Sequence, residues 1–95
     1  MDCKNGNGNS KELALDLLEL GKFYYLNEKY EEAVKVLMKA KKFDPLNADI
    51  FYNLGIVYET QNIVHEAKDC YLKAIELDPK SKNAQEHLDK LVGNQ

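Results

Sequence analysis

The sequence repeats itself after 34 residues, and this period constrains the fold more than any single residue does: Asp44-Pro45 returns as Asp78-Pro79. Residues 14–47 can be laid on residues 48–81 without a gap, and ten positions are then identical. The ten are Ala14, Leu20, Gly21, Tyr24, Glu32, Ala33, Lys39, Ala40, Asp44 and Pro45, each with its partner one period later. A fixed period of this length is typical of stacked helix pairs that hold a partner, so the sequence indicates binding rather than catalysis.

The size and composition of the chain exclude several classes of protein. Its 95 residues form one domain at most, and a net charge of −3 gives no broad basic surface for nucleic acid. No apolar run is long enough to span a membrane, and residues 1–9 lack the apolar stretch of a secretory signal. Two cysteines, Cys3 in the polar N-terminal segment and Cys70 inside an expected helix, do not make a disulfide framework. We therefore expect a cytoplasmic protein.

Apolar spacing, capping residues and prolines divide the chain into five expected helices with no strand. Residues 1–9 are rich in Asn and Gly and are expected to form a flexible tail. The expected helices run from Lys11, with Ser10 as N-cap, to about Leu26; from Tyr30 to Phe43; from the N-cap Asn47 through roughly Thr60; from Val64 to Leu77; and from the N-cap Ser81 to near Val92, before Gly93 as the C′ residue. Proline ends the second and fourth helices because it lacks an N–H and restricts the residue before it.

Glycine recurs at a helix-interior position, where it costs about 1 kcal/mol relative to alanine. Gly21 and Gly55 therefore need a compensating contact, and the simplest is close approach of the second helix of each pair. Ala33 and Ala67 are expected to offer the matching small surface. The other recurring residues are also assigned to packing: Ala40 and Ala74 toward the next helix, and Tyr24 and Tyr58 in the space that the small residues leave.

At these residues the chain resembles the tetratricopeptide repeat family. That family's pattern has large or small residues at fixed positions, and here the first repeat supplies Leu17, Leu20, Gly21, Tyr24, Ala33, Leu37, Ala40 and Pro45, and the second supplies Phe51, Leu54, Gly55, Tyr58, Ala67, Tyr71, Ala74 and Pro79. The resemblance implies an all-α, right-handed superhelix of helix-turn-helix units. Residues 10–46 would be the first repeat, 47–80 the second, and 81–93 a closing helix.

The turn between the two helices of each repeat departs from the family pattern. The family often has Gly there, whereas this chain has Glu28 and Asn62. Asn tolerates a left-handed backbone conformation more readily than Glu does. We therefore expect the first turn to be built differently from the second.

The resemblance also implies where a partner binds. Repeat positions 2, 5, 9 and 12 share one helix face, which in the family lines a concave groove for an extended peptide or a helix. The implied groove residues are Leu15, Leu18, Glu19, Lys22 and Tyr25 from the first helix, Asp49, Tyr52, Asn53, Ile56 and Glu59 from the third, and Asn83, Glu86, His87 and Lys90 from the last. Leu18, Tyr52 and Ile56 are expected to form an apolar strip, so the expected ligand is a hydrophobic or amphipathic protein segment.

One branch of the family grips the C-terminal carboxylate of a chaperone tail with Lys, Asn and Arg side chains. The corresponding residues here are Leu18, Lys22, Asn53, Asn83 and His87, of which only Asn53 agrees. A carboxylate clamp is therefore not expected.

No catalytic, metal-binding or cofactor-binding constellation is expected either. His65 and His87 are the only histidines, and Cys70 follows His65 at a spacing that matches no zinc site. Gly6 and Gly8 lie in the polar N-terminal segment with no strand before them, unlike the glycines of a phosphate-binding loop.

Two alternatives to groove binding remain open. The groove residues can be ordinary surface residues that bind nothing, since single exposed apolar side chains are normal. Alternatively, the first repeat has no helix before it, and stacking generally needs about three repeats. Leu13, Leu17, Leu37 and Met38 are placed at this open end, where a homodimer would bury them; a fragment of a longer array would show the same surface.

Overall fold

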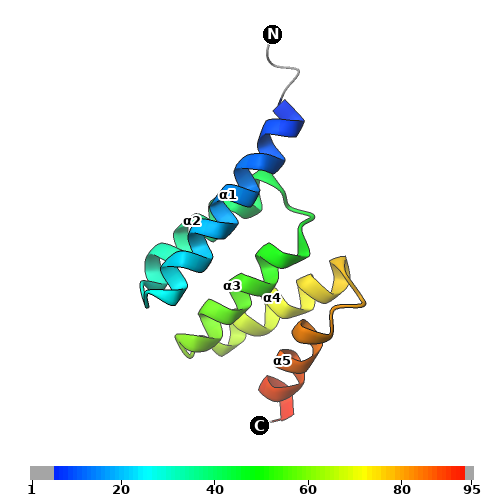
Figure 1. Cartoon of the computed structure of the whole chain (residues 1–95). Coiled ribbons are helices and arrows are strands. Elements are labelled where there is room, and N and C mark those ends of the chain that lie inside the picture. Colours follow the sequence, from blue (N-terminus) through cyan, green and yellow to red (C-terminus); the bar gives the residue numbers. More distant parts are fainter. Residues whose placement is uncertain (1–5, 94–95) are drawn as a thin grey trace. The chain divides into compact units, whose positions relative to one another are not determined.

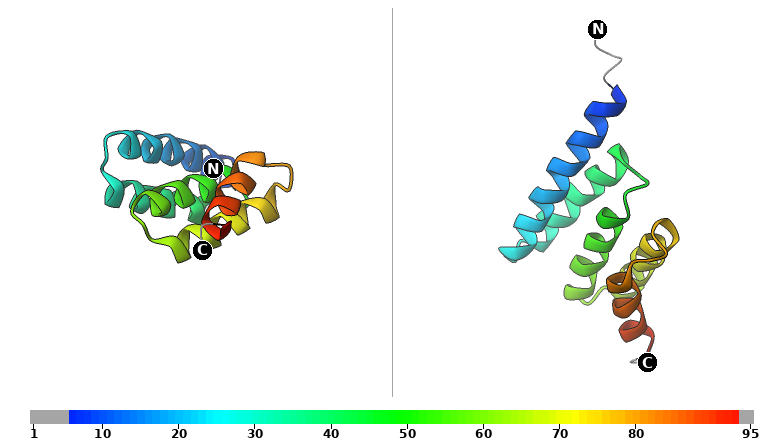
Figure 2. Two further views of the ribbon diagram at one scale, coloured as in Figure 1. Left: turned by 90° about the horizontal axis from the view of Figure 1, so that it is seen from below. Right: turned by 45° about the vertical axis from the view of Figure 1, so that its right-hand side comes forward.

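The computed structural model describes residues 6–93, and this part of the chain forms five α-helices and no strand (Figure 1). The helices are α1 (Gly6–Leu26), α2 (Tyr30–Phe43), α3 (Ala48–Thr60), α4 (Val64–Leu77) and α5 (Lys82–Gly93). The chain divides into two compact units, Met1–Leu46 and Asn47–Gln95. The first unit contains the hairpin of α1 and α2, and the second contains the hairpin of α3 and α4 with α5 packed against α4 (Figure 2).

The helix ends follow the sequence signals at most places and depart from them at the two ends of the chain. The helices α2 and α4 have the predicted bounds. The prediction for α1 was wrong, because this helix begins at Gly6 and includes Ser10, the residue expected to cap it. Residues 6–9 of the expected tail are thus helical, and residues 1–5 lie outside the described part. Nothing before Lys11 stops a helix as proline would, and extending an existing helix adds one hydrogen bond for each residue fixed.

The prediction for the last helix end was also wrong. Gly93 is the final residue of α5 and not a residue beyond it. Its backbone does not adopt a positive φ, so the left-handed conformation that makes glycine useful after a helix is not present there.

Side-chain caps begin α3 and α5, where the sequence predicts them. The Oδ1 atom of Asn47 accepts a hydrogen bond from the backbone N–H of Asp49 at 2.8 Å. The Oγ atom of Ser81 accepts a longer one, at 3.3 Å, from the N–H of Ala84. Each cap satisfies one of the N–H groups that the first turn of a helix leaves without an intrahelical partner.

The two interhelical turns have the same construction, contrary to the expectation for Glu28. Glu28 and Asn62 both adopt the left-handed conformation, with φ of 62° and 66°. In each turn the next N–H returns to the carbonyl of the recurring tyrosine, from Lys29 to Tyr24 at 2.9 Å and from Ile63 to Tyr58 at 2.8 Å. This six-residue closure is the Schellman motif, and its geometry requires a left-handed residue whatever side chain stands there.

The recurring glycines allow close packing of the hairpins, as predicted, but their partners differ from the prediction. An ideal Cβ atom at Gly21 would lie 2.6 Å from Cδ2 and Cγ of Leu37, and one at Gly55 would lie 2.6 Å from Cε1 of Tyr71. The large residue at the middle of the second helix therefore fills the glycine gap. The alanines expected there, Ala33 and Ala67, are completely buried nearby on the same helices.

The core of the second unit joins all three of its helices. It is formed by the buried residues Phe51, Ala67, Tyr71, Ala74, Ala84 and Leu88, with Tyr52, Ile56, Tyr58, Ile75, Leu77 and Leu91 packed against them. The helix α5 contributes Ala84 and Leu88, so it closes the hairpin as part of a common core.

Candidate partner-binding face

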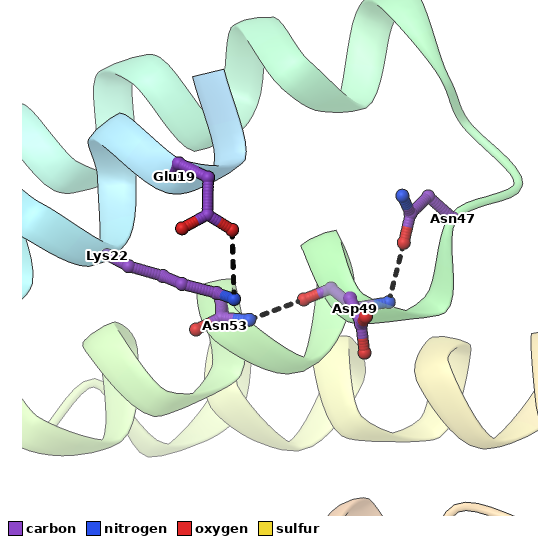
Figure 3. Close-up of polar contacts among 5 residues, drawn as sticks. All are labelled: Glu19, Lys22, Asn47, Asp49 and Asn53. Carbon is purple, nitrogen blue, oxygen red and sulfur yellow. Dashed lines mark hydrogen bonds and ion pairs between the residues drawn. The ribbon is translucent and has the colours of Figure 1, made fainter. Parts of the chain in front are cut away.

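The groove residues of α1 differ sharply in how much surface they offer. Leu15 is 51% exposed, whereas Leu18 is only 3% exposed and can offer little to a ligand. Lys22 is partly exposed, and its Nζ lies 3.3 Å from the Glu19 carboxylate, which therefore holds it as an ion pair (Figure 3). The ring of Tyr25 packs against that of Tyr30 with centroids 5.7 Å apart. The first unit thus presents Leu15, the Lys22–Glu19 pair and part of Tyr25.

The start of α3 places two polar groove residues in local hydrogen bonds. Asp49 gives its backbone N–H to the Asn47 side chain, as described above, and its carboxylate remains exposed. The Nδ2 atom of Asn53 donates to the backbone carbonyl of Asp49 at 2.8 Å, one turn back along the helix (Figure 3). This bond fixes the amide of Asn53 against its own helix, and the Oδ1 atom accepts no hydrogen bond from the described residues.

The helices α3 and α5 bring three predicted groove residues together, Tyr52 and Glu59 from α3 and His87 from α5. Nδ1 of His87 lies 3.0 Å from Oε1 of Glu59, although these residues are 28 positions apart. The ring of Tyr52 meets the ring of His87 edge-on, with centroids 5.7 Å apart. Residues from repeat positions 5 and 12 of one helix thus converge with one residue of the closing helix.

Tyr71 completes this cluster, although its repeat position predicts only a packing residue. Its hydroxyl donates to the same Oε1 of Glu59 at 2.6 Å, and its ring stacks on His87 with centroids 5.3 Å apart. Burial, followed by the hydrogen bond to Glu59, raises the pKa of Tyr71 well above its ordinary value of 10.0, so the hydroxyl keeps its proton and remains the donor. The signal in the sequence that could have identified Tyr71 as part of the site is its hydroxyl, at a packing position of the helix that pairs with the helix carrying Glu59.

The remaining groove residues lie around this cluster without joining it. Ile56 is partly buried against the core of the second unit. Asn83, Glu86 and Lys90 of α5 are exposed. The predicted strip of Leu18, Tyr52 and Ile56 draws on both units, so its continuity stays a prediction. The second unit by itself holds a face made of Tyr52, Asn53, Ile56, Glu59 and His87, which we call the α3–α5 face.

The described part of the chain offers little for other kinds of chemistry. Between residues 6 and 93 no group of three or more His, Cys, Asp and Glu side chains is arranged to hold a metal ion. His65 lies 3.8 Å from Asp69 one turn away, and both are exposed. Among these residues, no helix is both long and apolar enough to cross a membrane.

Two family models match this chain, and both describe the same repeat. A family model described as TPR repeat matches residues 21–62, and a model described as tetratricopeptide repeat matches residues 48–81. Anaphase-promoting complex subunit 3 of Dictyostelium discoideum is 31% identical over 65 residues, a match that covers 68% of this chain and 7% of that protein. This chain therefore spans only a small part of that relative's length.

Two solved structures have the same fold. The Arabidopsis OM64 TPR domain superposes with a TM-score of 0.86 at 20% identity, covering 90% of this chain and 70% of that one. A mutant of the protein MamA superposes with a TM-score of 0.76 at 23% identity, covering 85% of this chain and 59% of that one. At these identities the likeness shows the fold alone.

Proposed function

Since this chain belongs to the tetratricopeptide repeat family, whose members are protein-interaction modules, we propose that it binds a hydrophobic or amphipathic segment of a partner protein through the α3–α5 face. The observation that carries this proposal is the convergence of Tyr52, Glu59 and His87 from two helices. It joins an aromatic surface to fixed polar groups, which is the usual composition of a site that orients a ligand.

The apolar part of this face would supply most of the binding free energy. Tyr52 and Ile56 lie four residues apart on α3, so their side chains are neighbours on one helix face. Both are only partly buried, and their inner sides pack on the core of the second unit. A tyrosine whose ring is already held by neighbours loses little conformational entropy when a ligand covers it.

The polar part would set the orientation of the ligand. The side chain of Asn53 is held by its bond to the Asp49 carbonyl, which leaves Oδ1 to accept from a ligand N–H. Glu59 already accepts from Tyr71 and faces His87, so its charge is partly compensated within the protein. The face therefore favours a segment with apolar anchors and hydrogen-bond donors over a purely acidic or basic one.

The assembly role of a relative supports a scaffold function for this chain. The Dictyostelium protein is by its name a subunit of a complex, and it shares 31% of residues over the aligned segment. Modules of this kind hold components together without changing them chemically. We accordingly propose that this chain is a non-catalytic adaptor.

A peptide selection on the full chain tests the proposal. Random peptides displayed on phage would be selected on the wild-type chain, and the affinities of synthetic copies would be measured by calorimetry. We expect amphipathic sequences, and we expect Tyr52→Ala combined with Asn53→Ala to weaken their binding at least about tenfold, the effect of removing a central anchor.

A matched control separates binding from folding. Leu72 is 49% exposed on α4 and lies outside the α3–α5 face, so Leu72→Ala should leave the affinity unchanged. Circular dichroism and urea unfolding would show that each variant is folded under the binding conditions. If folded Tyr52→Ala/Asn53→Ala chains bind the selected peptides as tightly as wild type, the α3–α5 face is not the site.

A further inference from the structure

One face of α1 exposes apolar side chains to solvent at repeat positions that are buried in the equivalent helices α3 and α5. Leu13, Asp16, Leu20 and Phe23 step by three, four and three residues, so they share one helix face. Leu13, Leu20 and Phe23 are 46%, 38% and 59% exposed. Apolar side chains gathered on one face, unlike scattered ones, mark a surface that meets another molecule.

The residues at the equivalent positions of α3 and α5 are buried. One period after Asp16, Leu20 and Phe23 stand Ile50, Leu54 and Val57, which are 0%, 1% and 1% exposed. In α5 the first two positions are Ala84 and Leu88, both buried in the core of the second unit. These repeat positions therefore hold buried residues in α3 and α5 and exposed residues in α1.

Acidic side chains border the open face on α1. Glu12, Asp16 and Glu19 step by four and three residues and are all exposed. Glu19 is paired with Lys22, but Glu12 and Asp16 form no ion pair with any residue of the described part. We call Glu12, Leu13, Asp16, Leu20 and Phe23 the acidic α1 face.

A basic surface with an apolar floor lies on the neighbouring helix. Two shallow depressions on α2, of about 430 and 420 Å³, share Met38, which is 39% exposed, and Lys39. The rest of the first depression is lined by Tyr24 of α1 and by Glu32, Val34, Lys35 and Val36, and the rest of the second by Lys41 and Lys42. Glu32 is acidic, but within residues 6–93 neither it nor any other carboxylate forms an ion pair with Lys35, Lys39 or Lys42. We call this surface of Val34, Lys35, Met38, Lys39 and Lys42 the basic α2 face.

We propose that the acidic α1 face of one chain docks on the basic α2 face of a second copy. The two faces are complementary in apolar surface and in charge. Their exposed apolar groups can cover each other, and the unpaired carboxylates of one face can meet the unpaired ammonium groups of the other. This contact uses a surface other than the α3–α5 face and goes beyond the proposed adaptor function. Because the two faces differ, the contact is heterologous, and each added copy offers both faces again.

The second hairpin supports the choice of a second copy as the occupant. One period after Lys35 and Lys42 stand Asp69 and Glu76, and one period after Asp16 stands Ile50. Lys39 recurs as Lys73, but the charges of Asp16, Lys35 and Lys42 belong to the first hairpin alone, and the pattern common to both repeats does not require these three. The same chain carries both halves of the match.

Reciprocal charge reversal tests this contact. The first variant, Glu12→Lys/Asp16→Lys, makes both faces basic, and the second, Lys35→Asp/Lys42→Glu, makes both acidic. The second hairpin carries Asp and Glu at the latter positions within the same fold, so this change is compatible with folding. We expect wild type to associate at about 1 mM or below, and each variant alone to associate at least about tenfold more weakly.

Mixing the two variants should restore association to near the wild-type level, because each acidic face then meets a basic one. A control with Lys80→Glu/Lys82→Glu changes the net charge by the same amount on exposed residues outside both faces, and it should associate as wild type does. Masses would come from sedimentation equilibrium and folding from circular dichroism. A monomeric wild type, variants that associate as well as wild type, or folded variants whose mixture stays monomeric would each overturn the proposal. Retained association in Tyr52→Ala/Asn53→Ala would separate this contact from the α3–α5 face.

Discussion

Leu37 occupies the space that a side chain at Gly21 would need, since an ideal Cβ atom there would lie 2.6 Å from both Cγ and Cδ2 of the leucine. Leu37 is completely buried, so it has no open direction in which to move. The contact between these two residues fixes the distance between α1 and α2. The same relationship recurs between Gly55 and the ring of Tyr71.

We predict that Gly21→Ala destabilises the chain although alanine favours the helix. The gain in helix propensity is about 1 kcal/mol, whereas overpacking of a closed core typically costs about 1–3 kcal/mol. The double variant Gly21→Ala/Leu37→Ala checks the cause, because the shorter residue makes room for the new methyl group. Urea unfolding should show that Leu37→Ala is less damaging in the Gly21→Ala chain than in wild type. Equal cost in both backgrounds would contradict the assigned contact.

We predict that Glu28→Gly stabilises the chain. Glu28 has a φ of 62°, a conformation that costs a residue with a Cβ atom roughly 1–2 kcal/mol. Glycine adopts it freely but has more freedom to lose from the unfolded state, so we expect a net gain of about 0.5–1 kcal/mol. Asn62→Gly, at the matching turn, should gain less, since Asn tolerates this conformation better. The midpoints of urea unfolding measure both, and a loss of stability in Glu28→Gly would show that its turn is not strained.

We predict that Tyr71 makes the stability of the second unit fall at high pH. Burial first, and then the bond to Glu59, raise the pKa of Tyr71 in the folded chain above its ordinary value of 10.0. The folded state therefore holds this proton more tightly than the unfolded state does. The contribution of Tyr71 to the free energy of unfolding is therefore fully present below about pH 10 and is lost as the pH rises above that value.

Tyr71→Phe is the variant that checks this pH dependence. It should cost about 1–3 kcal/mol near neutral pH, because a hydrogen bond to a charged group is lost, and it should flatten the decline above pH 10. Some decline should remain, because burial, followed by the charges of Cys70 and Glu66, also raises the pKa of Tyr58. The measurement is the free energy of unfolding between pH 8 and pH 12 for wild type and variant. Parallel curves would contradict the role of Tyr71.

We predict that Asn47→Ala costs about 1 kcal/mol, the usual value for loss of an N-cap. Its side chain accepts from Asp49 at 2.8 Å, whereas the Ser81 cap of α5 is longer at 3.3 Å. Ser81→Ala should therefore cost less. Hydrogen exchange would locate the effects, with faster exchange in the first turn of α3 for Asn47→Ala and in that of α5 for Ser81→Ala. Equal effects at both helices would argue against a contribution from cap geometry.

The sequence predicted those helix ends that depend on local chemistry. Proline after Asp44 and after Asp78 lacks the N–H that would continue the helix and disfavours helical backbone at the residue before it, so the ends of α2 and α4 followed directly. The start of α1 depends on whether a weak polar segment joins an existing helix, and the sequence holds no stop signal there. Glu28 was misjudged because the closure of the hairpin, and not the preference of its side chain, decides the conformation of the turn.

The candidate site could be predicted only as a set of helix positions. Repeat spacing placed Tyr52, Glu59 and His87 on groove faces. That the Glu59 carboxylate contacts both His87 and Tyr71 depends on how far each side chain reaches in space, which spacing does not give. Tyr71 was missed because its position is a packing position, and only its hydroxyl makes it polar. Leu18 and Leu37 were expected to offer surface and are buried, since spacing gives the direction of a side chain but not what covers it.

The shared turn construction also sets a strict length for each hairpin. A single tyrosine carbonyl, that of Tyr24 or Tyr58, receives the N–H that follows the left-handed residue. One inserted residue would rotate the following helix by about 100° around its own axis. Leu37 or Tyr71 would then point away from its glycine, and the hairpin would lose its closest contact. The turns therefore tolerate changes of residue type far better than changes of residue number.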